Sequence, residues 1–289
     1  MSPEGIARAD SPTVKRGSYF YYRHALAVRI MHWVNVMVLA TLFMSGLNIF
    51  SAHPALYLGK SSYTGNGPVF QITARAANNQ VIGVTRAFGY EFTTTGMLGA
   101  VAGPGGRVTE RTFPSWITLP GSRWLSMARR WHFLFAWVFV INGLSYLAYS
   151  VWSRHLARDL APTATDFRSI GRSILDHLRF RHPTGEADKR YNVLQKLAYL
   201  AVILGLLPLI VLTGFAMSPS LNSVLPGWVD VLGGRQSART LHFIIAWLLV
   251  AFVFIHVFEV ITSGFWNHVR SMITGRYRVR LETVHENAR

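Results

Sequence analysis

Two histidines in one long apolar stretch, His242 and His256, have the spacing of ligands stacked across a membrane. They stand fourteen residues apart, close to four helical turns, so both rings leave the same face of a helix. The rise between them is about 21 Å, which places one ring near each side of a hydrocarbon core about 30 Å thick. Ionisable side chains inside a membrane are costly and mark functional positions. The spacing therefore predicts two metal centres, one near each membrane face.

Four of the eleven histidines lie inside apolar segments, and they are the strongest metal ligands that the sequence offers. No cysteine is present, which excludes disulfides, cysteine-bound iron-sulfur clusters and a covalently attached c-type haem. The alternative interpretation of each histidine, taken singly, is a polar residue hydrogen-bonded between helices. The four candidate ligands are His32, His132, His242 and His256.

The composition indicates an integral membrane protein. Of the 289 residues, 51% are hydrophobic and only 15% are charged, whereas a soluble domain carries about a quarter charged residues. Four apolar segments are each long enough to span a bilayer as a helix, so the predicted fold class is an all-α bundle of four transmembrane helices. The first eighteen residues contain no apolar run, so no cleaved signal peptide is expected. The predicted helices cover about 30–50, 131–152, 194–217 and 241–261.

The distribution of basic residues predicts that both termini are cytoplasmic. Five lysines and arginines precede the first segment, eight lie between the second and third, and five follow the fourth, against two between the third and fourth. The connection 51–130 then lies outside the cytoplasm. It has short strand-like runs near 69–73 and 107–109, and it is either a functional surface or disordered. The cytoplasmic connection 153–193 contains an amphipathic helical pattern at 166–180.

This orientation sorts the four histidines into two pairs. The first helix runs outward and the second inward, so His32 and His256 lie near the cytoplasmic side, whereas His132 and His242 lie near the outer side. Two imidazoles at one depth suit six-coordinate haem iron, which carries electrons because both axial positions are filled. The predicted cofactors are therefore two haems, one held by each pair.

Arginine and glycine positions support haem over a bare metal. Three of the four histidines are preceded by arginine at a distance of three residues, from which a guanidinium can bind a haem propionate. The alternative is that these arginines extend to the membrane surface without touching a cofactor. Gly46 and Gly143 would let a porphyrin approach the backbone, unless they serve ordinary helix packing. The predicted propionate contacts are Arg29, Arg129, Arg130 and Arg239.

The ligand segments resemble the bacterial di-haem cytochrome b family, which includes the cytochrome b subunits of nickel-iron hydrogenases and formate dehydrogenases. The resemblance is carried by Arg29-Ile-Met-His32-Trp33-Val-Asn35, by Arg130-Trp131-His132-Phe133, and by Arg239-Thr-Leu-His242 with His256. It implies a single membrane cytochrome b domain over residues 1–289, in the respiratory chain of a bacterial inner membrane. The long connection 51–130 is not shared with the hydrogenase subunits, and the fifth helix of some relatives is absent.

The function that this resemblance implies is electron transfer between a quinone pool and a partner redox protein, through two haem b groups. Within the family, the chain is most similar to partners of periplasmic molybdopterin oxidoreductases, so a periplasmic redox subunit is expected as the partner. Membrane lipid is the other expected contact, and nucleic acid is not expected. Asn35 and Lys196, on the cytoplasmic side, are candidate quinone contacts.

Two alternatives remain at the level of the sequence. One is a stand-alone membrane oxidoreductase that acts on superoxide or ferric ion at an outer haem. The other is a haem-free transporter or scaffold, although the chain is short for a transporter and no internal repeat is evident in it. Copurification of a partner subunit separates the first alternative from the predicted function, and a haem absorption band excludes the second.

Overall fold

The computed structural model describes residues 14–62, 67–77, 80–179, 192–224 and 227–284. The chain forms two compact units. The helical unit comprises residues 30–153 and 199–255, and the terminal unit comprises residues 1–29, 154–198 and 256–289. Each unit is described by itself below.

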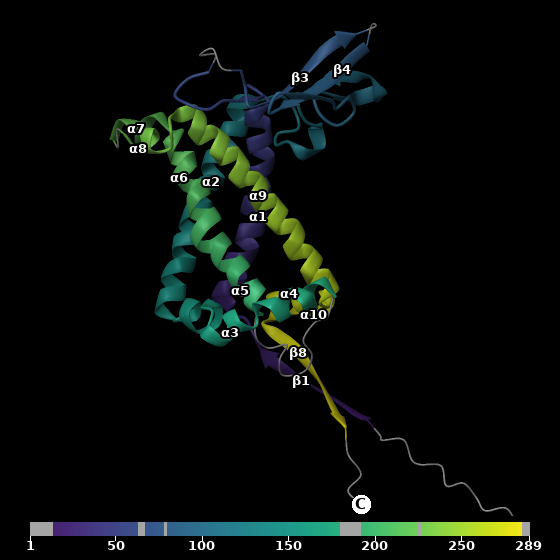
Figure 1. Cartoon of the computed structure of the whole chain (residues 1–289), viewed down its shortest axis with the longest axis vertical. Coiled ribbons are helices and arrows are strands. Elements are labelled where there is room, and N and C mark those ends of the chain that lie inside the picture. The colour runs from purple at the N-terminus through teal and green to yellow at the C-terminus, as the bar shows by residue number, and fades with distance from the viewer. Residues whose placement is uncertain (1–13, 63–66, 78–79, 180–191, 225–226, 285–289) are drawn as a thin grey trace, which may run out of the picture. The chain divides into compact units, whose positions relative to one another are not determined.

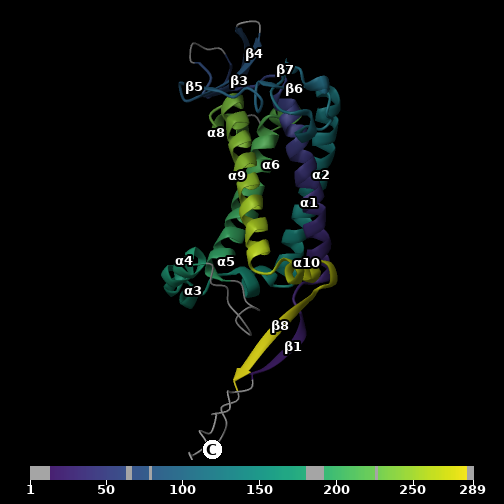
Figure 2. The ribbon, with the colours of Figure 1, turned by 90° about the vertical axis from the view of Figure 1, so that its right-hand side faces the viewer.

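Four helical segments are long and apolar enough to cross a membrane, and most of their length belongs to the helical unit (Figures 1 and 2). Their lengths of 24 to 28 residues exceed the roughly 20 residues that a bilayer requires. Their mean hydropathies are 1.6 to 2.6, and many of their large apolar side chains are exposed. Such exposure is expected of helices that face lipid. The segments are α1 (Leu26–Phe50), α2 (Leu125–Trp152), the run from α5 (Val193–Leu200) to α6 (Leu207–Ala216), and α9 (Arg235–Thr262).

The chain is thus mostly helical, with four candidate membrane spans where the sequence predicts them, but three of the helices begin earlier than predicted. The helices α1, α2 and α9 start four to six residues before the apolar runs. Their first turns carry arginine and alanine, which are good helix formers although they add little to an apolar segment. The connection after α1 consequently ends at residue 124, six residues earlier than predicted.

The third segment changes its winding in the middle. A π-helical stretch, Ala201–Leu206, separates α5 from α6, and Pro208 lies in the first turn of α6. Proline has no N–H to donate to the carbonyl four residues before it, and its ring crowds that carbonyl. A wider local turn is one way to relieve that crowding. The stretch packs against α9, because Val202, Ile245 and Leu249 form one buried cluster.

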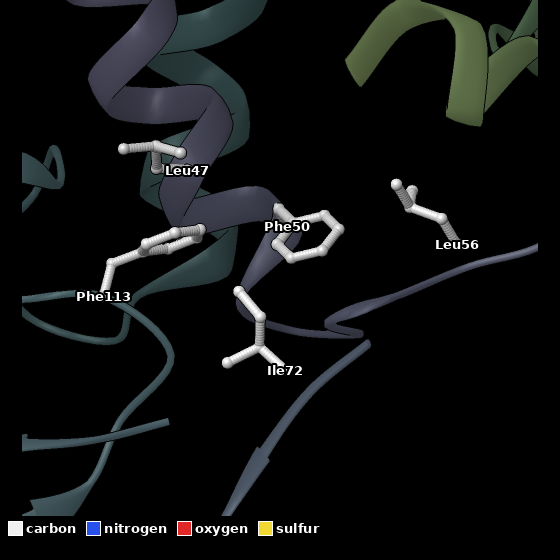
Figure 3. Packing of buried hydrophobic residues seen from close by; sticks show 5 residues of the cluster. All are labelled: Leu47, Phe50, Leu56, Ile72 and Phe113. Carbon is white, nitrogen blue, oxygen red and sulfur yellow. The ribbon is translucent and has the colours of Figure 1, made fainter. Parts of the chain in front are cut away.

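The residues between α1 and α2 form ordered β-structure rather than an irregular loop. Phe50, the last residue of α1, enters a buried apolar cluster with Leu56, Ile72 and Phe113 (Figure 3), so the end of α1 is part of the core beneath this structure. A four-stranded antiparallel sheet has the order β2-β3-β4-β5, and β6 pairs with β7. The strands are β2 (Ala55–Leu56), β3 (Phe70–Ala77), β4 (Gln80–Ala87), β5 (Tyr90–Thr93), β6 (Ala100–Ala102) and β7 (Val108–Glu110), with 3₁₀ turns at Pro104–Gly106 and Ser115–Ile117.

Two glycines permit this β-structure to pack tightly. A Cβ at Gly83 would lie 2.1 Å from the Leu98 carbonyl oxygen, and one at Gly99 would lie 2.2 Å from the Thr73 carbonyl oxygen. Gly99 also has a φ of +77°, which glycine adopts at little cost. The short strands expected near 69–73 and 107–109 are present, as β3 and β7.

In the terminal unit, the two ends of the described chain pair as an antiparallel ribbon. Strand β1 (Val14–Tyr22) pairs with β8 (Arg276–Val284), with Val14 opposite Val284 and Tyr22 opposite Arg276. Tyr277 and Val279 alternate with exposed arginines along β8 and are fully buried. Helix α10 (Phe265–Thr274) directly precedes β8. The sequence did not predict this ribbon.

The remaining helices are short. The amphipathic pattern at 166–180 forms two helices, α3 (Ala164–Arg168) and α4 (Ile170–Leu178), instead of one, while residues 180–191 lie outside the described residues. A π-helical turn at Leu156–Leu160 precedes them. In the helical unit, α7 (Pro219–Val224) and α8 (Trp228–Val231) occupy most of the connection between α6 and α9.

An ion pair within the terminal unit joins the start of α3 to the start of α5. Lys196 Nζ donates to Asp166 Oδ2 at 2.8 Å, and the same carboxylate accepts the Thr163 backbone N–H in a capping box. Both side chains of the pair are mostly shielded, at 12% exposure for Lys196 and 23% for Asp166. The bond from Lys196, followed by the bond from the Thr163 backbone, lowers the pKa of Asp166 from 3.8 to about 2.

We expect Asp166→Asn to destabilise the protein at pH 7 by about 1 kcal/mol, after allowance for solvent screening. Because the carboxyl pKa is lower in the folded protein, the ionised group stabilises the fold at pH values above the unfolded pKa of 3.8. This stabilisation is lost as the pH falls towards 2. The difference in thermal midpoint between variant and wild type, measured in detergent, should therefore shrink between pH 4 and pH 2. Asp230→Asn is the matched control, because Asp230 pairs with Lys60 at 2.9 Å but both are largely exposed. A difference that is the same at pH 7 and pH 2.5 would contradict this assignment.

Candidate functional site

Two of the predicted ligands, His132 of α2 and His242 of α9, face each other inside the helical unit. Their ring centroids lie 6.3 Å apart and their planes make an angle of 63°. Both residues stand in the first half of their helices, and these helices begin at the end of the bundle where β2–β7 lie (Figure 2). The sequence alone predicted this pairing from depth, and the two rings are indeed adjacent.

Each of these two rings is held by a hydroxyl from a neighbouring helix. His132 Nδ1 lies 3.0 Å from Ser45 Oγ of α1, and His242 Nδ1 lies 3.0 Å from Thr213 Oγ1 of α6. Each hydroxyl donates its own hydrogen to a backbone carbonyl, Ser45 to Thr41 at 2.7 Å and Thr213 to Leu209 at 2.8 Å. The hydroxyl oxygens are therefore acceptors, and both Nδ1 atoms carry the proton.

With the proton on Nδ1, the lone pair of each ring is on Nε2. A neutral imidazole with Nδ1–H hydrogen-bonded and Nε2 available is the arrangement found in histidine ligands of metals.

A glycine follows each of these hydroxyl residues and lies against the same ring. A Cβ on Gly46 would stand 3.4 Å from His132 Cε1, and a Cβ on Gly214 would stand 3.4 Å from His242 Cε1. At Gly46, the absent side chain thus makes room for the imidazole itself. A Cβ on Gly143, the other glycine singled out in the sequence, would meet no atom within 4 Å. The predicted porphyrin contacts of both glycines stay predictions.

The spacing of the rings fits one iron between them. With metal–imidazole bonds of about 2 Å and ring centres about 1.2 Å behind the donor nitrogen, two ligands on opposite sides of one metal have centroids about 6 Å apart. The observed separation of 6.3 Å agrees with this value. The residues present therefore fit a bis-histidine haem at this position.

The second predicted pair is divided between the two units. His32, on α1, belongs to the helical unit and lies edge-on to Trp33 at 5.4 Å, whereas His256 belongs to the terminal unit. Their pairing stays a prediction. The turn of α1 that contains His32 is fixed to α2, because Asn142 Nδ2 donates to the Met31 carbonyl at 3.0 Å and to Asn35 Oδ1 at 2.8 Å.

The four predicted propionate contacts have different surroundings. Arg29 donates to the Ile273 carbonyl at 2.5 Å within the terminal unit. Arg239 donates to the carbonyls of Ala55 and His53, and so connects the start of α9 to the chain after α1. Arg129 lies over the Phe133 ring at 5.4 Å, and together with Arg130 it lines an open groove along α2. Their contacts with propionates stay predictions.

His53 lies outside the helices, next to Arg239. Burial, and secondarily the charge of the Arg239 guanidinium, lower the pKa of His53. Its ring stacks on Tyr57 at a centroid distance of 6.0 Å. His53 is therefore mainly neutral at pH 7, and it lies half-buried beside Arg239 after the end of α1.

The two residues proposed as quinone contacts both have protein partners. Asn35 accepts from Asn142, and Lys196 is paired with Asp166. Sequence reasoning missed Ser45, Thr213 and Gly214 as residues of the site. The signal that identifies them is a Ser/Thr-Gly dipeptide in each of two apolar helices.

Comparison with known proteins agrees with this geometry. The family model for prokaryotic cytochrome b561 matches residues 23–275 of the chain. A candidate protein-methionine-sulfoxide reductase subunit of Azospira oryzae is 39% identical over 145 residues, which cover 50% of this chain and 69% of that protein. A candidate B-type cytochrome subunit of a nickel-iron hydrogenase from Cupriavidus necator is 27% identical over 157 residues, which cover 50% of this chain and 64% of that protein. No solved structure gives a significant match.

Proposed function

Because this chain belongs to the prokaryotic cytochrome b561 family, we propose that it is a di-haem membrane cytochrome that passes electrons between a quinone pool and a partner redox protein. The family match confirms the resemblance on which this function was predicted, and it covers all four candidate membrane spans. Family membership links the chain to b-type haem and to electron transfer with redox partners.

The observation that supports this proposal most is the opposed pair His132 and His242, each with Nδ1 engaged and Nε2 available. Haem iron with two imidazole ligands supplies reversible one-electron transfer and leaves no position for oxygen. The chain's own contribution is to hold the two rings on separate rigid helices, so that little rearrangement accompanies a change of charge. The apolar side chains of these helices exclude water from the site and so influence its potential.

A second haem, with His32 and His256 as its ligands, is part of the same proposal. His256 follows His242 by about 21 Å along α9. Two haems at these levels would carry electrons from one membrane face to the other. In this proposal, residues 1–289 are one membrane cytochrome domain, both termini are cytoplasmic, and β2–β7 lie outside the inner membrane.

The names of the two relatives suggest the kind of partner. One is named as a subunit of a protein-methionine-sulfoxide reductase and the other as a B-type cytochrome subunit of a nickel-iron hydrogenase, so both names describe a subunit of a redox enzyme. We place a periplasmic redox partner, of the molybdopterin-dependent class, on the side of β2–β7. The quinone then exchanges electrons near the pair on the cytoplasmic side.

The test is haem content and quinol reactivity of the purified chain. After expression with sufficient haem, the pyridine haemochrome assay should give two haem b per polypeptide, and dithionite should sharpen the Soret band. A short-chain quinol should reduce the haems in the absence of any partner. Colourless protein would contradict the proposal and support a haem-free transporter or scaffold. Oxidation by superoxide or ferric ion, without reaction with quinol, would support the stand-alone oxidoreductase instead.

A further inference from the structure

We propose that Ser45 and Thr213 are positioning residues that set the angle between the two imidazole planes, and with it the electronic symmetry and potential of the haem iron between them. This inference rests on the proposed function and deepens it. Neither residue would touch the iron. Each acts through the histidine to which it is hydrogen-bonded.

The two positions are built in the same way. Each hydroxyl donates to the carbonyl four residues before it, accepts from a histidine Nδ1 at 3.0 Å, and is followed by a glycine against the same ring. Each hydroxyl also lies 3.1 Å from the carbonyl oxygen three residues before it, of Leu42 or Ile210. Two independent copies of one arrangement, on α1 and on α6, indicate a shared task.

The helices that carry the histidines repeat one another too. Residues 128–137 read Ala-Arg-Arg-Trp-His-Phe-Leu-Phe-Ala-Trp, and residues 238–247 read Ala-Arg-Thr-Leu-His-Phe-Ile-Ile-Ala-Trp, with six of ten positions identical. The first residue of each copy, Ala128 or Ala238, is fully buried. Helices α1 and α2 therefore correspond to α6 and α9 as two similar halves. The chain therefore does contain an internal repeat, contrary to the expectation from the sequence. The repeat was overlooked because it is short and unrelated connections interrupt it.

The hydroxyls fix how the rings are turned. A hydrogen bond from Nδ1, together with the narrow space beside Cε1 that the glycine leaves, gives an imidazole little freedom to rotate about its Cβ–Cγ bond. The result is an angle of 63° between the two planes. Planes that are far from parallel interact with both of the iron orbitals that bind imidazole π-electrons, which keeps these orbitals close in energy. Oxidised haem iron held by such rings would have a highly anisotropic low-spin EPR spectrum, whereas parallel rings would give a rhombic one.

The same hydrogen bonds make the ligands more basic. An Nδ1–H that donates to an oxygen leaves more electron density on Nε2, which favours the oxidised metal. Loss of one hydroxyl should therefore raise the midpoint potential of this haem. The histidine should still bind the iron through Nε2, but without the hydroxyl its ring can turn about the Cβ–Cγ bond.

The experiment compares Ser45→Ala, Thr213→Ala and the double variant with wild type in the full-length haem-loaded protein. We expect two haems per chain throughout, a change of one EPR signal towards the rhombic form, and a more positive midpoint for one haem only. Thr213→Ser and Ser45→Thr keep a hydroxyl and should restore the wild-type signal. The matched controls are Ser145→Ala and Thr41→Ala, whose hydroxyls also bind the carbonyl four residues before them.

An unchanged EPR spectrum and midpoint in the double variant, with both haems present, would overturn the inference. Loss of one haem in Ser45→Ala would support it only if Ser45→Thr restores binding, and would overturn it otherwise. Wild-type protein without haem would instead contradict the proposed function, so the two failures are distinguishable.

Discussion

Replacement of His132 by alanine is expected to lower the haem content from two per chain to one, and His242→Ala should remove the same haem. Haem b is held without covalent attachment, so axial ligation contributes a large part of its binding. The two rings share one site at a centroid distance of 6.3 Å. The double variant His132→Ala/His242→Ala should therefore lose no more haem than either single variant. The pyridine haemochrome assay measures this directly.

Combining substitutions across the two predicted sites distinguishes the pairing from its alternatives. His132→Ala/His256→Ala should contain no haem, whereas His32→Ala/His256→Ala should retain one. The matched control is His268→Ala, because His268 Nε2 is hydrogen-bonded to Ser263 Oγ at 3.1 Å and His268 is not one of the four predicted ligands. That control should keep both haems. If His132→Ala and His242→Ala together remove both haems while each alone removes one, the two residues serve different irons and the pairing is wrong.

The sequence was sufficient to predict the candidate membrane helices and the proximity of His132 to His242, while binding of one iron by the two rings stays a prediction. An apolar run of about 20 residues predicts a span whatever surrounds it. The depth of His132 and His242 follows from their places in two such runs, and the structure places their rings side by side. Helix starts were less accurate, since Arg129 and Arg239 interrupt the apolar pattern without interrupting the helix.

What the sequence did not predict depends on contacts between distant segments. The sequence around Ser45 predicts only a helix residue. The hydrogen bond between its hydroxyl and His132 depends on α2 packing beside α1. The β1–β8 ribbon joins residues at opposite ends of the chain, and no local signal specifies such a partner. The sheet of β2–β5 similarly depends on Phe50, which was predicted only as the end of a membrane helix and contributes to the core beneath the strands.

The contacts that the sequence did not predict have a common physical origin, and it also applies to the histidine site. Periodicity indicates which face of a helix is apolar, but two helices with equally apolar surfaces give no signal for which pairs will touch. In this chain, small and polar residues determine which helices pack against each other. Asn142 binds α2 to α1, and Ser45-Gly46 and Thr213-Gly214 create the close approaches at the histidines.

Gly214→Leu should weaken haem binding at the His132–His242 site by about tenfold to a hundredfold, because forced overpacking in a well-packed site costs about 1–3 kcal/mol. A Cβ at this position already reaches His242 Cε1 at 3.4 Å and Nδ1 at 3.7 Å, so further carbon atoms must displace the ring. Gly46→Leu should act in the same way through His132. The measurement is the rate at which haem leaves to an acceptor protein in excess.

The size of the added side chain supplies the control for this effect. Gly214→Ala adds only the Cβ, at ordinary contact distance, and should have a small effect. Gly205→Leu places the same leucine in the neighbouring π-helical stretch, where a Cβ meets no atom within 4 Å, and should leave haem loss unchanged. Equal haem loss in Gly205→Leu and Gly214→Leu would mean that leucine disturbs the helix rather than the ring. If haem leaves faster only from Gly214→Leu, the space at Gly214 is needed to keep the His242 ring in position.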